Sequence, residues 1–189
     1  MQRRAVLLGL PLALAGCAGT SVRAPEAAIA LARYRDPGPA ALALVTVRNE
    51  GSNDGAHTAI IINASERVLF DPYGTWADPR APERDDVLHG FSPAVEEAYL
   101  AYQAGGGYYY VRQEKLVDPA TAEAALVRAK GYGAVGMAQC TLAASDILRG
   151  LPGFEGLGRP LLPNGLRARF GRLPGVTTTE RHGVPPTDA

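Results

Sequence analysis

The stretch GMAQCTLAASDILRG, residues 136–150, decides the fold that the sequence predicts. It leaves a glycine-rich turn and runs through small and apolar residues until Gly150, which predicts a helix with Cys140 in its first turn. A thiol there lies near free backbone N–H groups and the positive end of the helix dipole, and both favour the thiolate. This position is typical of a nucleophilic cysteine. The alternative is a small buried residue, because Cys140 shares a helical face with Ala144 and Ile147.

A predicted hairpin supplies two residues that could act with this thiol. Residues 57–63 and 67–72 are rich in β-branched and apolar side chains, and a short connection joins them. In an antiparallel hairpin, the start of the first strand lies beside the end of the second, so His57 and Asp71 are expected to be neighbours. The alternatives are a solvated histidine at a strand edge and an Asp71 that only shapes a turn before Pro72.

These residues match the needs of a cysteine hydrolase. A thiol nucleophile requires a base that takes its proton and a third group that fixes the base. We therefore predict a catalytic site made of Cys140, His57 and Asp71, with Asp71 orienting the His57 ring. The backbone N–H of Cys140 is expected to form part of an oxyanion hole, to which the side chain of Gln139 could add a donor.

The remaining histidines, His89 and His182, lie in a predicted loop and tail and are expected to be solvated. Cys140, His57, Asp71 and His89 are all possible metal ligands. The chain lacks the closely spaced ligand pairs of common metal sites, so neither a metal nor a cofactor is predicted.

The N-terminus predicts export and membrane attachment. Residues 1–16 combine a positive start with an apolar run too short to span a bilayer, which predicts a secretory signal. The tetrapeptide LAGC, residues 14–17, resembles the lipobox of bacterial lipoproteins, in which the signal is removed before the cysteine and the thiol is lipidated. The resemblance implies a cell-envelope protein attached to the membrane through Cys17. Ala18 after the cysteine implies the outer membrane, with the protein facing the periplasm.

If Cys17 carries lipid, Cys140 is the only thiol of the mature chain, so no internal disulfide can form. Basic and acidic residues are equal in number, 19 each, without long runs of one sign, and a nucleic-acid partner is therefore not predicted.

The chain length predicts one globular domain. We expect a lipidated N-terminus, tether and short helix over residues 17–39, an α+β domain over 40–173, and a flexible surface tail over 174–189. The domain is expected to contain a small antiparallel sheet with helices packed on one face, the Cys140 helix among them. The polar, proline-containing segment 78–89 is expected to lack regular structure.

The order of these elements resembles circularly permuted papain-like proteins of the NlpC type. The resemblance is carried by HTAIII at residues 57–62, by QCTLA at residues 139–143 and by PNGL at residues 163–166, and it covers residues 42–172. It implies a permuted papain-like domain in which the histidine strand precedes the cysteine helix. Many permuted members have asparagine before the cysteine, where this chain has Gln139.

Together these features predict a lipid-anchored thiol hydrolase that cleaves an amide bond, with cell-wall (peptidoglycan) peptide as substrate and partner. An acyl-ester or lipid-amide hydrolase or acyltransferase is an alternative, because permuted relatives resembling the lecithin retinol acyltransferase group act on acyl chains. A second alternative is a non-catalytic envelope lipoprotein that binds a partner with the same scaffold. A secreted effector is less favoured because of the predicted anchor.

Overall fold

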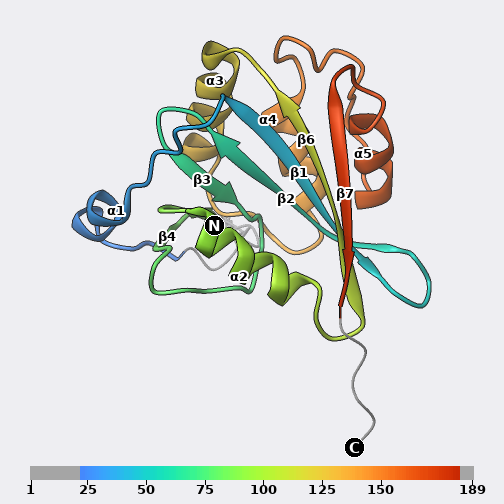
Figure 1. The fold of residues 1–189 in the computed structure, drawn as a ribbon, viewed down its shortest axis with the longest axis horizontal. Helices are drawn as coiled ribbons and strands as arrows, with labels where there is room; N and C mark the ends of the chain where they lie inside the picture. The colour runs from blue at the N-terminus through green and yellow to red at the C-terminus, as the bar shows by residue number, and fades with distance from the viewer. Residues whose placement is uncertain (1–21, 184–189) are drawn as a thin grey trace, which may run out of the picture.

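The computed structural model describes residues 22–183, which form helices and one antiparallel sheet (Figure 1). The sheet has seven strands in the order β4-β5-β3-β2-β1-β6-β7. The predicted α+β composition with an antiparallel sheet is confirmed. The predicted signal, residues 1–16, and Cys17 lie outside the described residues. Within residues 22–183, no helix has the length and apolar character needed to cross a bilayer.

The strands are β1 (Ala41–Asn49), β2 (Gly55–Asn63), β3 (Arg67–Phe70), β4 (Glu83–Arg84), β5 (Val87–Leu88), β6 (Tyr108–Leu116) and β7 (Val176–His182). The helices are α1 (Glu26–Ala32), α2 (Pro93–Gln103), α3 (Pro119–Tyr132), α4 (Cys140–Leu148) and α5 (Pro163–Phe170). The predicted hairpin is β2–β3, and the predicted cysteine helix is α4. Asp118 caps α3 as its sequence indicates, because its carboxylate accepts from the backbone N–H of Thr121 at 2.9 Å.

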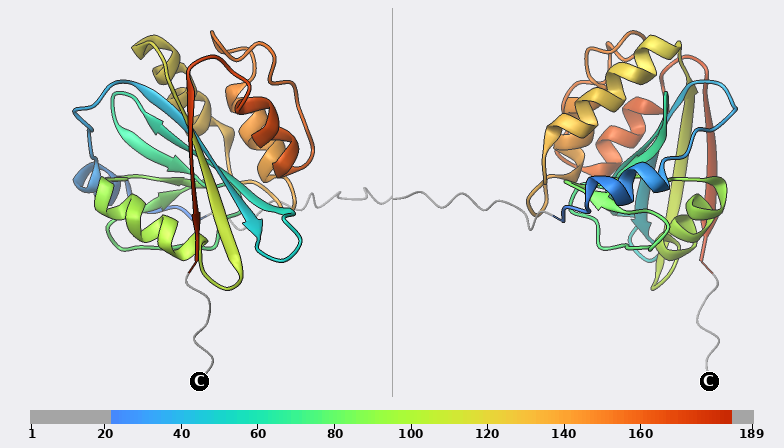
Figure 2. Two further views of the ribbon diagram at one scale, coloured as in Figure 1. Left: turned by 45° about the vertical axis from the view of Figure 1, so that its right-hand side comes forward. Right: turned by 90° about the vertical axis from the view of Figure 1, so that its left-hand side faces the viewer.

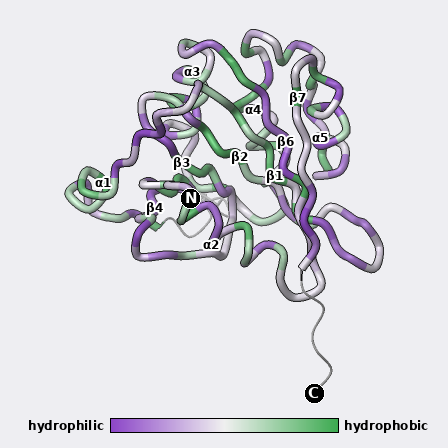
Figure 3. Tube along the Cα trace, in the orientation of Figure 1, coloured by the Kyte–Doolittle hydropathy of each residue, from purple (hydrophilic) through white to green (hydrophobic). Residues whose placement is uncertain are grey.

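Helices cover both faces of the sheet, whereas the sequence predicted one covered face. Helices α3, α4 and α5 pack on one face, and α2 packs on the other (Figure 2). The side chains of β2 alternate between the two cores: Ile60 and Ile62 contact the three-helix side, and Ala59 and Ile61 contact the α2 side. Figure 3 shows β2 and β3 as hydrophobic segments, as expected for strands covered on both faces.

Three segments differ from their predicted irregular structure. Residues 176–182, predicted as part of a flexible tail, form β7, which pairs along β6 from Lys115 to Tyr109 and leaves its own side chains exposed. The segment 78–89 contains β4 and β5. Residues 22–24, predicted as tether, extend this hairpin through a bridge between Arg23 and Arg84. In each case the missing partner is distant in sequence, so local composition does not predict the pairing.

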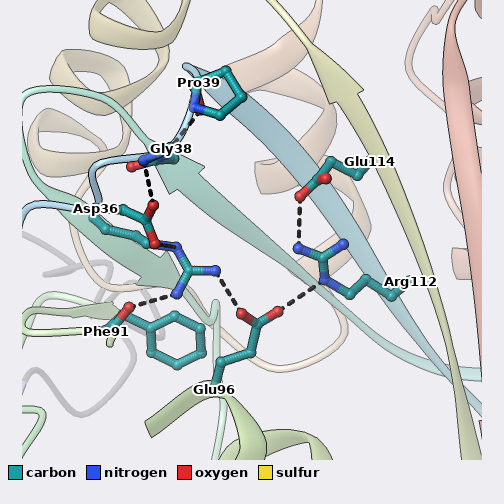
Figure 4. Close-up of polar contacts among 9 residues, drawn as sticks. Asp36, Gly38, Pro39, Phe91, Glu96, Arg112 and Glu114 are labelled. Carbon is teal, nitrogen blue, oxygen red and sulfur yellow. Dashed lines mark hydrogen bonds and ion pairs between the residues drawn. The ribbon is translucent and has the colours of Figure 1, made fainter. Parts of the chain in front are cut away.

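A network of charged side chains fixes α2 on the sheet (Figure 4). Glu96 of α2 accepts from Arg67 of β3 at 2.5 Å and from Arg112 of β6 at 2.8 Å. Arg67 also donates to the backbone oxygen of Phe91 at 2.7 Å, and Arg112 donates to Glu114 at 2.6 Å. These bonds connect the helix to two separate strands, and they set the position of the α2 residues that approach the candidate site.

Candidate active site

Cys140 is the first residue of α4 and lies at the uncovered edge of β2. Strand β3 pairs with β2 only from Ile60 to Asn63, so the β2 edge from Gly55 to Ala59 is not covered by β3. Thr58 in this part of β2 and Thr141 of α4 are both buried, and their hydroxyls lie 3.3 Å apart. This contact fixes the start of α4 against β2. The half-buried Cys140 is thereby placed next to the strand that carries His57.

The turn before Cys140 has a constrained backbone. Gln139 donates its backbone N–H to the carbonyl of Gly136 at 3.3 Å, and Ala138 within this turn has a φ of 61°. A non-glycine residue in the left-handed region is uncommon and is held there by surrounding structure. The side chain of Gln139 is exposed and does not cap the helix. Because Cys140 starts the helix, its backbone N–H has no partner within α4 and can serve as a donor at the site.

His57 lies on the opposite face of β2 from α4, beside an irregularity in the strand. The register between β1 and β2 shifts after the pair Val47 and His57, so Ala56 is an extra residue. Such bulges redirect neighbouring side chains. The His57 side chain retains 17% of its exposure, and its Nε2 lies 2.6 Å from Oδ1 of Asp71. The other ring nitrogen, Nδ1, is therefore the one available to the thiol.

Asp71 follows the last residue of β3 and shares a face with His57. If the register of Ile60 with Phe70 continued, Asp71 would lie opposite Ala59, one same-face position along the strand from His57. Its carboxylate is 1% exposed, and Oδ1 also accepts from the hydroxyl of Tyr99 at 3.0 Å. Within residues 22–183, the buried Oδ2 has no hydrogen-bond partner.

The charges of these groups are coupled. Burial opposes a charged His57 ring, but the charge and hydrogen bond of Asp71, together with Cys140, raise the pKa of His57 to about 10. Burial would likewise raise the pKa of the Cys140 thiol. Hydrogen bonding and charge from His57, with hydrogen bonds from Thr141 and the backbone of Thr58, outweigh burial and lower the pKa of Cys140 below its ordinary value. The arrangement favours a thiolate beside an imidazolium.

An open groove of about 700 Å³ reaches His57 from the α2 side of the sheet. Tyr73, Tyr102 and Tyr108 contribute large side chains to its walls, and glycine, alanine, Val47, Thr75 and Gln103 complete the lining with His57. Among residues 22–183, no aspartate, glutamate, lysine or arginine lines the groove. His57 is part of the lining, and Cys140 is not.

Two residues next to Asp71 were not predicted from the sequence. Tyr99 is fully buried in α2, and its ring packs edge-on against Trp76 and Phe91. Burial and the charge of Asp71 raise the pKa of Tyr99 well above its ordinary value, so its hydroxyl stays protonated and donates. Gly74 donates its backbone N–H to the carbonyl of Asp71 at 2.8 Å, and a Cβ at this position would overlap Asp71 Oδ2.

The sequence indicates the contact with Asp71 for Gly74 but not for Tyr99. The DPYG segment, residues 71–74, is a recognisable turn, and Tyr73 within it has a φ of 59°. The close approach of Gly74 to the carboxylate could therefore have been suspected. Tyr99 lies in α2, and nothing in its local sequence indicates that it contacts Asp71 at the end of the second hairpin strand.

The other predicted polar residues lie away from the thiol. His89 is buried, contrary to prediction, and its Nδ1 lies 3.3 Å from Oε2 of Glu66. His182 is exposed as predicted, and it pairs with Glu50 at 2.8 Å. Among residues 22–183, no three histidine, cysteine or carboxylate side chains are grouped as metal ligands.

Comparison of this chain with protein-family models, with curated proteins and with solved structures gave no match.

Proposed function

We propose that this protein is a lipid-anchored thiol hydrolase of the bacterial cell envelope with a permuted papain-like arrangement, and that it cleaves an amide bond. The observation that carries the proposal is the arrangement of three groups, in which the buried Asp71 holds the His57 ring at 2.6 Å beside the half-buried Cys140. This arrangement raises the pKa of the histidine and lowers that of the thiol. A cysteine used only for packing needs no charged partner. The Cys17 anchor and the periplasmic location come from the lipobox resemblance, and cell-wall peptide is the substrate proposed on that basis.

The chemistry follows from the positions of the three groups. The Cys140 thiolate attacks the carbonyl carbon of the amide, and the backbone N–H of Cys140 stabilises the negative charge on oxygen. The His57 imidazolium then gives its proton to the leaving amine as the C–N bond breaks, which leaves a thioester. Neutral His57 takes a proton from water, the resulting hydroxide attacks the thioester, and the carboxylic acid leaves as the thiolate returns. Asp71 and Tyr99 hold the ring in place throughout.

A second candidate is hydrolysis or transfer of an acyl chain through an ester or lipid amide. The uncharged, tyrosine-walled groove beside His57 favours it, because peptide substrates bearing carboxylates or amines are commonly held by charged side chains. The same catalytic groups serve both reactions. A peptidoglycan stem peptide and a p-nitrophenyl ester of a medium-length fatty acid, tested side by side, separate the two.

The test of the nucleophile is the rate of Cys140 alkylation by iodoacetamide as a function of pH, read by mass spectrometry of the peptide that contains Cys140. In the wild-type chain, the thiolate–imidazolium pair persists from the lowered pKa of Cys140 up to the pKa of His57 near 10, so the alkylation rate is expected to stay nearly constant over the pH range just below that value.

In a His57→Ala chain the thiol loses its partner and remains partly buried. Its alkylation rate is expected to rise about tenfold per pH unit across the same range. Cys140→Ser should remove turnover of both substrates while preserving the circular dichroism spectrum. Turnover by that variant at the wild-type rate, or a wild-type thiol that reacts only after unfolding, contradicts the proposal.

A further inference from the structure

Asp86 connects the separate segments that carry the candidate catalytic groups. It lies in the β4–β5 turn, is 6% exposed and has a φ of 66°. Its Oδ2 accepts from the backbone N–H of Val135 at 2.7 Å and from that of Tyr73 at 3.3 Å. Its own carbonyl accepts from the backbone N–H of Asp71 at 2.8 Å. One residue therefore contacts three points of the chain through hydrogen bonds.

Each of these three points leads directly to a part of the site. Asp71 orients the His57 ring. Tyr73 lines the groove and precedes Gly74, which packs on the Asp71 carboxylate. Val135 lies in the loop between α3 and Cys140. Neither loop is held by helix or strand hydrogen bonds, so the bonds to Asp86 join the turn that carries Asp71 to the loop that leads to Cys140, in addition to the Thr58–Thr141 contact between β2 and α4.

We propose that Asp86 is a positioning residue that sets the approach of the Cys140 sulfur to the His57 ring by joining the Val135 loop to the Asp71–Gly74 turn. The inference rests on the proposed thiol chemistry and adds to it a residue that touches neither the thiol nor the ring. Its side chain acts through two backbone N–H groups, and these require an acceptor of the right length at this place in the turn.

The chain offers a matched pair of substitutions. Asp86→Asn and Asp86→Gly both suit a φ of 66°, but only asparagine keeps an acceptor oxygen at the position of Oδ2. Asp86→Ser, whose shorter hydroxyl can accept from one N–H, is expected to fall between them and carries the test if the glycine variant does not fold. The readouts are the pH profile of Cys140 alkylation and the kcat/KM of the active substrate.

For Asp86→Gly, we expect alkylation at pH 7 to slow by roughly tenfold and to become dependent on pH, and kcat/KM to fall on the order of 100-fold, the effect of misplacing a reacting group by about 1 Å. For Asp86→Asn, both values should stay within about threefold of wild type. The control is Glu66→Gln, which alters a buried carboxylate at the closed end of the β2–β3 hairpin. It should lower the thermal midpoint and leave the alkylation profile unchanged.

The outcomes separate the two proposals. If the alkylation rate of Cys140 in the wild-type chain rises steeply with pH, the proposed chemistry is wrong, and the role of Asp86 fails with it. A flat wild-type profile that persists in Asp86→Gly and in Asp86→Ser overturns only the positioning role, whatever the loss in thermal midpoint. If Asp86→Asn lowers the alkylation rate and kcat/KM as much as Asp86→Gly does, the positioning role is also contradicted, because the acceptor oxygen would then have no effect.

Discussion

Substituting Gly74 with alanine tests the geometry of the site with a single methyl group. A Cβ built on Gly74 overlaps Oδ2 of Asp71 and lies 3.0 Å from the Asp71 backbone oxygen. The Asp71 side chain is 1% exposed, and its Oδ1 is bonded to His57 and Tyr99. The added methyl group must therefore displace either the carboxylate or the turn that carries Gly74.

The expected size of the effect follows from those bonds. To restore a normal contact, the carboxylate must move by roughly 1 Å or more, which breaks or bends the hydrogen bonds at 2.6 Å to His57 and at 3.0 Å to Tyr99. Hydrogen bonds to a charged group contribute about 1.5–3 kcal/mol each, so we expect the free energy of unfolding to fall by about 2–4 kcal/mol. The loss in kcat/KM should be on the order of 100-fold, because the ring loses its fixed position.

The assay combines urea unfolding, substrate kinetics and the alkylation profile of Cys140. Gly131→Ala is the control: this residue is inside α3, no atom lies within 4 Å of a Cβ built there, and its helical position predicts a gain of about 0.5–1 kcal/mol. A Gly74→Ala chain with wild-type stability and turnover would refute the claim that the Asp71 carboxylate is fixed by this packing.

Three further predictions follow from the same structure. Tyr99→Phe keeps the buried ring and removes one hydrogen bond to Asp71. We therefore expect kcat/KM to fall about tenfold and the free energy of unfolding to fall by about 1–2 kcal/mol, both measured beside wild type. Despite burial, hydrogen bonds from His89 and Lys130 lower the pKa of Glu66 to about 2, so its contribution of about 3 kcal/mol is present above pH 4.5 and is lost as pH falls toward 2. Urea unfolding across that range should show this slope in wild type and not in Glu66→Gln. Removing residues 176–189 uncovers the β6 edge and should lower the thermal midpoint and promote self-association, seen by light scattering.

The sequence predicted the parts of the site that depend on local pattern. The hairpin could be recognised from its apolar strands and short connection, and antiparallel pairing makes His57 and Asp71 neighbours. That their side chains share a face follows from the register of Ile60 with Phe70, which the sequence does not specify. The position of Cys140 at the start of a helix likewise follows from the glycine before it and the unbroken apolar run after it. Asp118 stands before a proline and good helix formers, a local pattern that indicates a helix cap, and its carboxylate does cap α3.

The remaining features depend on contacts between distant segments. The four residues of β4 and β5 have no strand pattern of their own and form strands because β5 pairs with β3. β7 is polar along its length and is regular only because β6 offers it a free edge. His89 is buried because Glu66, from another turn, lies beside it. Tyr99 reaches Asp71 because the Glu96 network places α2, and no local sequence signal encodes that network.

The site joins groups from opposite faces of one sheet at the edge that β3 leaves uncovered. Before this sheet forms, Cys140 is an ordinary thiol with an ordinary pKa, and it gains its imidazolium partner only when α4 has docked. In the proposed hydrolase, the unfolded polypeptide would carry little nucleophilic reactivity toward oxidants or amides. Formation of the fold would thus act as the activation step of the proposed hydrolase.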